Sequence, residues 1–186
     1  MAAAPDAGAS TLARQRGDDG PGIQVEDIVE IRRELDHVFD FLSDGERLPA
    51  WMAGVKRAKR TSPPGGTGAG TTYRIVGKAL GRRVESSYQL TAYEPGQRFS
   101  SRMESPFFRL DQAYTFRESA GVTRVTLTGK AVPLGRFKLL GPVLFVAMQR
   151  QVRADHRGLK GVLERSKGQS RTGPTRRRKV RAATEG

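Results

Sequence analysis

The chain has 186 residues, which fits one domain with terminal extensions. It contains no cysteine, and this excludes a disulfide framework, a thiolate zinc site and a cysteine nucleophile. The formal net charge is +14. The longest apolar run, residues 143–148, is far shorter than the roughly 20 residues of a membrane-spanning helix. With no secretory signal pattern at the N-terminus, we expect a cytoplasmic protein.

The positive charge is concentrated at the C-terminal end of the chain. The last 22 residues carry eight basic side chains and one acidic side chain, including the block Arg176, Arg177, Arg178 and Lys179. Such a block can contact an anionic membrane or nucleic acid through its charge, although a solvated tail is the commoner case. No aromatic residue lies among these charges, so base stacking is not indicated.

Both ends of the chain lack the periodicity of folded elements. Residues 1–22 are rich in Ala, Gly and Asp, and residues 167–186 have no apolar face. Both compositions are typical of disordered segments. We therefore expect a single folded domain over residues 23–166.

Alternation of apolar and polar residues predicts a series of strands. The alternating segments are residues 24–32, 55–61, 71–79, 83–93, 98–104, 108–118 and 122–132. Two short helices, residues 35–42 and 46–52, are predicted after the first strand, with Ser43 or Asp44 capping the second. Short turns at Gly81, Pro95 and Gly121 join successive strands, which indicates antiparallel pairing.

A long helix is predicted over residues 142–165. Pro142 suits a helix start, because proline at the first helical position loses no needed hydrogen-bond donor. One face carries an apolar stripe made of Leu144, Met148, Val152, Leu159 and Leu163. This helix is the only element large enough to cover a sheet of this size. The predicted fold is therefore α+β, a curved antiparallel sheet of six or seven strands wrapped around a C-terminal helix.

Seven short phrases in this order resemble one superfamily. They are VFDFLSD (38–44), LPAWM (48–52), GTTYR (70–74), GRRVE (81–85), YEPGQRF (93–99), GVTRVTL (121–127) and LKGVLE (159–164). Together they resemble the SRPBCC superfamily of START-like and Bet v 1-like helix-grip proteins, and within it the bacterial polyketide cyclase/dehydrase-like branch. The resemblance covers about residues 23–165.

The resemblance implies a hydrophobic cavity between the sheet and the long helix. By alternation and helical spacing its lining would be Tyr73, Tyr88, Leu90, Phe99, Met103, Tyr114 and Phe116, facing Phe145, Met148 and Val152. Trp51 is expected near the cavity mouth, either as a packing anchor or as part of the lining. The alternative is that all these side chains fill a solid core, because periodicity does not distinguish the two cases.

Polar groups on the inner faces are the candidates for chemistry. His156 and Asp155 fall on or beside the apolar stripe, where His156 can bond a ligand or act as a base. The favoured interpretation is nevertheless that the helix end has left the core and both residues are solvated. Arg82 is in phase with the inward residues but is expected at the rim. Two histidines so far apart in sequence, with no cysteine, argue against a metal site.

Three functions fit these patterns. The first is binding of a small hydrophobic ligand, lipid-like, polyketide or aromatic, with no cofactor. The second is a polyketide cyclase/dehydrase-type enzyme using the same cavity, for which the resemblance suggests arginine and tyrosine as working residue types. No nucleophile–base pair stands out, so no catalytic residue is assigned. The third is a non-catalytic accessory protein docked by its basic tail. The sequence does not indicate an oligomeric state.

Overall fold

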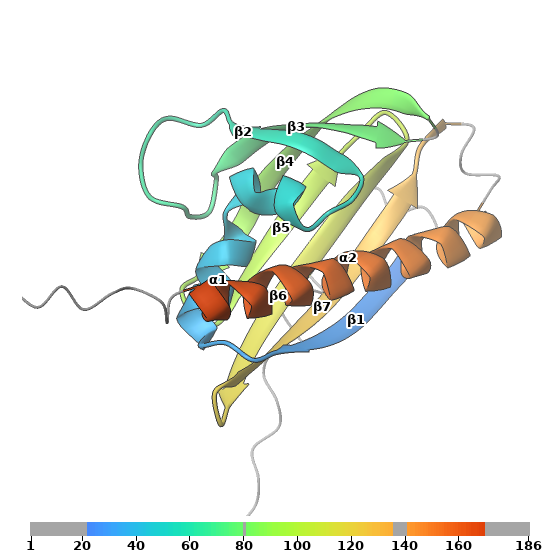
Figure 1. Cartoon of the computed structure of the whole chain (residues 1–186). Helices are drawn as coiled ribbons and strands as arrows, with labels where there is room; N and C mark the ends of the chain where they lie inside the picture. Colours follow the sequence, from blue (N-terminus) through green and yellow to red (C-terminus); the bar gives the residue numbers. More distant parts are fainter. Residues whose placement is uncertain (1–21, 80, 136–140, 170–186) are drawn as a thin grey trace, which may run out of the picture.

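A computed structural model describes residues 22–79, 81–135 and 141–169. A strongly curved antiparallel sheet of seven strands surrounds the long C-terminal helix on one side (Figure 1). The elements are β1 (Ile23–Ile31), α1 (Leu35–Ser43), the 3₁₀-helix η2 (Gly45–Ala50), β2 (Val55–Arg60), β3 (Thr72–Ala79), β4 (Arg82–Glu94), β5 (Arg98–Glu104), β6 (Phe108–Ser119), β7 (Val122–Pro133) and α2 (Gly141–Gln169). The predicted fold class is confirmed.

The strand order is β1-β7-β6-β5-β4-β3-β2. Strands β2 to β7 pair with their neighbours in sequence, whereas β1 pairs with β7, from Ile23 opposite Ala131 to Ile31 opposite Thr123. The first strand and the second therefore form the two opposite edges of the sheet. The two short helices α1 and η2 carry the chain from one edge to the other.

The alternation in the sequence correctly identifies the concave face. In the register of the sheet, Tyr73 lies opposite Tyr88, Tyr88 opposite Met103, and Met103 opposite Leu110. Cross-strand partners share a face of the sheet, and all four of these side chains are buried. A slip of one residue would have moved the whole set to the solvent side.

The second short helix differs from its prediction. It is a 3₁₀-helix that ends at Ala50, so Trp51 is its C-cap residue and does not lie within an α-helix over residues 46–52. Pro49 disfavours an α-helix here, because its ring clashes with the carbonyl four residues earlier and it disfavours the α conformation at Leu48. The predicted cap at its start is confirmed, since the Asp44 side chain accepts a hydrogen bond from the Glu46 N–H at 3.0 Å.

The two halves of α2 are buried to different extents. In the C-terminal half, Leu159 and Leu163 are fully buried. Toward the N-terminal end, Val146 is 48% exposed, and Met148 is only half-buried against the core. The C-terminal end is fastened by the Arg33 guanidinium, whose Nε donates to the Leu163 carbonyl at 2.9 Å. The C-terminal half is therefore the fixed part of the helix, and α2 continues to Gln169, beyond the predicted end at residue 165.

We expect Leu159→Ala to lower the free energy of unfolding by about 2–5 kcal/mol, because the residue is fully buried where α2 meets the sheet. The matched control on the same helix is Val146→Ala, expected to change stability by less than about 0.5 kcal/mol because Val146 is exposed. Urea unfolding of both variants measures the difference. Equal losses would contradict the unequal burial of the two halves.

Candidate ligand site between the sheet and the C-terminal helix

The interior beneath α1 is filled by aromatic rings. The Phe39 ring makes edge-on contacts with Tyr93, Phe99 and Phe116 at centroid distances of 5.1–5.9 Å. The Phe99 ring also stacks on Tyr114 at 4.8 Å. Such pairs add to the stability that burial of apolar area provides. Phe99 and Phe116, two predicted lining residues, thus take part in a packed aromatic cluster.

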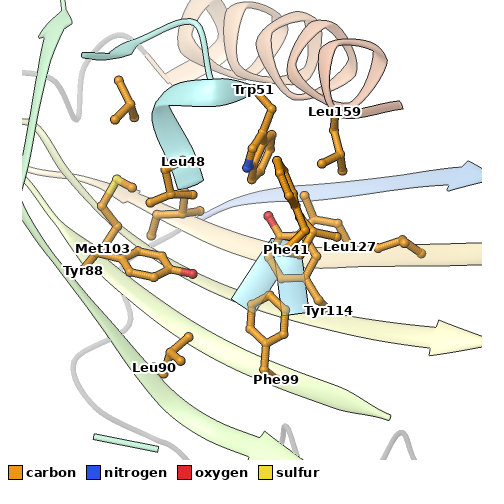
Figure 2. Packing of buried hydrophobic residues seen from close by; sticks show 14 of the residues in the cluster. Phe41, Leu48, Trp51, Tyr88, Leu90, Phe99, Met103, Tyr114, Leu127 and Leu159 are labelled. Carbon is orange, nitrogen blue, oxygen red and sulfur yellow. The ribbon is translucent and has the colours of Figure 1, made fainter. Parts of the chain in front are cut away.

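The other predicted lining residues lie in the same interior, between the sheet, η2 and α2. Buried residues of the set are Trp51, Tyr73, Tyr88, Leu90, Phe99, Met103, Tyr114 and Phe116. Met148 and Val152 are half-buried and pack against this cluster, and the side chain of Phe145 lies outside the described residues. The indole nitrogen of Trp51 and the hydroxyl of Tyr88 point toward the same interior space (Figure 2). Burial is expected of a cavity lining and of a filled core alike.

The three buried tyrosines on the concave face differ in their partners. The Tyr73 hydroxyl interacts with the Gly45 backbone and the Thr67 side chain, and the net effect of its burial is a raised pKa. Burial raises the pKa of Tyr88 to about 12, opposed by the neighbouring Ser101 hydroxyl. Burial likewise raises the pKa of Tyr114, and the charge of Asp155 adds to it. Tyr88 and Tyr114 are therefore protonated at neutral pH and can donate hydrogen bonds.

His156 and Asp155 are buried, so the interpretation that both are solvated is wrong. The His156 side chain is 3% exposed, and its Nδ1 lies 2.6 Å from Asp27 Oδ2 on β1. Its ring lies 6.3 Å from the Trp51 ring and 6.5 Å from the Tyr114 ring, measured between centroids. The helix end stays in the core because β1 covers it on one side and the segment after η2 covers it on another.

Asp155 connects the segment after η2 to α2 through hydrogen bonds. Its Oδ1 accepts hydrogen bonds from the Ala53 N–H at 3.1 Å and from Gln151 Nε2 at 2.8 Å. Burial raises the pKa of Asp155, and the two hydrogen bonds oppose this shift. Close approach is possible because Gly158 has no side chain, as a Cβ there would lie 3.2 Å from the Trp51 carbonyl oxygen. Asp155 thus positions Trp51, which serves as an anchor and also faces the interior.

Two buried side-chain nitrogens have no hydrogen-bond partner among the described residues. They are Nε1 of Trp51, a donor, and Nε2 of His156, and the buried oxygens Ser101 Oγ and Gln149 Oε1 likewise have no partner there. A buried polar group without a partner costs about 1–3 kcal/mol. Such atoms are therefore rare in folded proteins and call for a specific explanation.

The sequence prediction missed one member of this site. Alternation places Asp27 on the inner face of β1 beside Val25 and Val29. Alternation alone does not identify the residue that pairs with this carboxylate. The sequence did indicate that such a partner exists, because an acidic side chain on an apolar inner face needs a hydrogen-bonding partner. The partner, His156, lies 129 residues away in the chain.

Arg82 is exposed at the start of β4, and its predicted role at the rim stays a prediction. Arg176, Arg177, Arg178 and Lys179 lie outside the described residues, so their contact with a membrane or nucleic acid also stays a prediction. Within the described part of the chain, no group of three or more His, Asp or Glu side chains could hold a metal ion. No helix among the described residues is both long enough and apolar enough to cross a membrane.

An open groove of about 910 Å³ lies between β1 and α2. Its lining includes Asp27, Ile28, Arg150 and Arg157, and His156 also contributes to it. The His156–Asp27 pair therefore lines this groove while the His156 ring also lies near Trp51 and Tyr114.

The fold is shared by solved structures of low sequence identity. A START superfamily protein from Mycobacterium smegmatis has a TM-score of 0.67 and 14% identity, over 77% of this chain and 98% of its own. The Zhui aromatase/cyclase from Streptomyces sp. R1128 has a TM-score of 0.68 and 16% identity, over 81% of this chain and 98% of its own. A protein from Thermus thermophilus has a TM-score of 0.65 and 22% identity, over 77% of this chain and 98% of its own. No curated protein matches the sequence.

The sequence itself matches a family model. The model describes polyketide cyclase/dehydrase and lipid-transport proteins, and it matches residues 22–165. This range includes all seven strands and most of α2, so the match extends over the whole concave sheet and its covering helix. The chain therefore belongs to the polyketide cyclase/dehydrase and lipid-transport family, and its fold is that of START-like proteins.

Proposed function

We propose that this protein binds a small, mostly apolar molecule in the interior between the sheet and α2. Trp51, Tyr88, Tyr114 and His156 would supply its polar contacts. The observation that carries the proposal is the pair of buried, unpaired nitrogens on Trp51 and His156, beside two protonated phenols in an otherwise apolar interior.

The contrast with other buried polar groups supports a ligand. Asp155 accepts two hydrogen bonds, and Thr123 donates to the Arg33 carbonyl at 2.7 Å. Asp155 and Thr123 are thus paired within the fold, as buried polar groups in proteins generally are. The nitrogens of Trp51 and His156 depart from that rule, which is expected where a bound molecule completes the pairing.

The chemistry of the interior favours a ligand with aromatic or lipid-like bulk and a few oxygens. Aromatic and aliphatic walls bind the bulk, and the phenols of Tyr88 and Tyr114 donate to carbonyl or ether oxygens. Membership of a family described by polyketide and lipid substrates agrees with this class. Access near the partly buried Met148 and Val152 would use the less buried half of α2. The proposed site of action is the cytoplasm.

A second candidate is a cyclase or dehydrase reaction in the same interior. Two phenols whose pKa values are raised can hold their protons while polarising a carbonyl oxygen, as donors do in acyl and aldol chemistry. The structural likeness to an aromatase/cyclase gives this candidate its reaction class.

Ligand uptake is tested with the apolar dye N-phenyl-1-naphthylamine and with native mass spectrometry of the purified chain. We expect dye emission to rise on binding, and Ser101→Leu to abolish this rise while changing stability by less than about 0.5 kcal/mol. The reason is that Ser101 is buried on the concave face beside Tyr88, where a larger side chain would occupy ligand space. In a filled core the same substitution would overpack and cost about 1–3 kcal/mol.

The matched control is Ile28→Ser, in the groove between β1 and α2. Ile28 is 46% exposed, and its loss should leave dye uptake unchanged. If Ile28→Ser abolishes uptake and Ser101→Leu does not, the dye binds the outer groove and the interior site is wrong.

The cyclase candidate predicts turnover of a linear poly-β-ketone thioester to a cyclic product lighter by one water. Tyr114→Phe should slow this turnover at least tenfold while changing affinity less than threefold, because the phenol acts on the developing oxyanion. Mass spectrometry of the product follows the reaction, with Tyr93→Phe as the control. Equal rates in both variants would remove Tyr114 from the chemistry.

A further inference from the structure

We propose that the His156–Asp27 pair is an acceptor site for a hydroxyl group of the ligand, of the phenol or enol class. This inference rests on the proposed function and deepens it by naming a chemical group that the ligand carries. It is carried by the geometry of the pair, the burial of the imidazole and the unpaired nitrogens on His156 and Trp51.

The contact with Asp27 fixes which imidazole nitrogen carries the proton. Asp27 Oδ2 lies 2.6 Å from Nδ1, and a carboxylate can only accept a hydrogen bond. Nδ1 therefore carries the hydrogen, and the neutral ring presents a lone pair on Nε2. This nitrogen is buried and has no partner among the described residues.

The neutral form is the stable one in this environment. Burial lowers the pKa of His156, although the carboxylates of Asp27 and Asp155 oppose this shift. An imidazolium would also need an acceptor for a hydrogen on Nε2, and the described residues offer none. At neutral pH, Nε2 of His156 therefore accepts a hydrogen bond and does not donate one.

The groups that face His156 select the ligand's polar group. Asp27 faces it from β1, Tyr114 from β6 and Trp51 from the segment after η2, while Asp155 precedes it on α2. The Trp51 Nε1–H is an unpaired donor, and its ring lies 6.3 Å from the imidazole at an interplanar angle of 36°. A hydroxyl both donates and accepts, so its chemistry matches an acceptor such as Nε2 and a donor such as the Trp51 Nε1–H. A carboxylate only accepts, and two neighbouring carboxylates repel it.

The test compares 2-naphthol with naphthalene, which has the same rings and no hydroxyl, by calorimetric titration of the full chain. In the wild type we expect 2-naphthol to bind at least tenfold more tightly than naphthalene. In His156→Phe this advantage should shrink about tenfold, which is about 1.4 kcal/mol, while naphthalene affinity changes less than twofold. His37→Phe, on the exposed side of α1, is the matched control and should behave as the wild type.

The outcomes separate this inference from the proposed function. If both probes bind the wild type equally, or if His156→Phe weakens both equally, the hydroxyl site is wrong and ligand binding stands. If neither probe binds, the proposed function itself fails, and with it this inference.

The tautomer of His156 can also be measured directly in the wild-type protein. Nitrogen-15 NMR of the histidine side chains should show His156 neutral at pH 7, with hydrogen on Nδ1 and a bare Nε2. In Asp27→Asn the share of this tautomer should fall. A wild-type ring with hydrogen on Nε2 would overturn the inference. The chain has a single tryptophan, and its indole N–H resonance should move further with 2-naphthol than with naphthalene.

The lowered pKa of His156 also predicts the direction of a stability change with pH. Below the ordinary histidine value of 6.5 the unfolded chain takes up a proton that the folded chain resists, so stability falls as the pH drops from 7 toward 5. Urea unfolding across this range should show a smaller fall in His156→Phe and an unchanged fall in His37→Phe. An equal fall in His156→Phe would show that folding does not lower the pKa of His156, which contradicts the predicted preference of the buried site for the neutral ring.

Discussion

The position of α2 over the sheet depends on two successive residues of this helix, which form hydrogen bonds with different parts of the chain. Asp155 accepts from the Ala53 N–H, and His156 bonds Asp27 on β1. One turn of the helix is thereby attached both to the edge strand and to the segment that leads to the opposite edge. The neighbouring Leu159 and Leu163 add apolar burial to the same end. These contacts and this burial together hold the C-terminal half of α2 over the sheet.

The strands were predictable from the sequence because their signal is local. Alternation within each strand correctly placed Tyr73, Tyr88 and Tyr114 on the concave face, and no distant information was needed. The burial of His156 was not predictable in this way, because it depends on cover from β1 and from residues near Trp51. Pro49 indicated that an α-helix over residues 46–52 was unfavourable, because the proline ring and the restricted residue before it disfavour an α-helix interior.

The interior is not uniform in its polarity. Beneath α1, Phe39, Phe99 and Phe116 pack ring against ring, as in an ordinary apolar core. Toward α2 the same space holds the nitrogens of Trp51 and His156 without partners among the described residues. A sequence that only needed a stable core would have continued the apolar packing, because unpaired polar groups reduce stability. The difference between the two ends is the physical ground for placing ligand chemistry near α2.

The fold alone leaves the ligand open, because START-like proteins at 14% to 22% identity keep the sheet and the helix while most side chains differ. In the proposed function, selectivity comes from the few polar atoms inside. Asp27 has a particular place among them, since its side chain is 19% exposed and lines the outer groove while its oxygen holds a buried imidazole. A carboxylate in this position accepts a hydrogen bond from Nδ1 and so fixes the tautomer of His156. A charge at the boundary thus sets the hydrogen-bonding character of a neutral site inside.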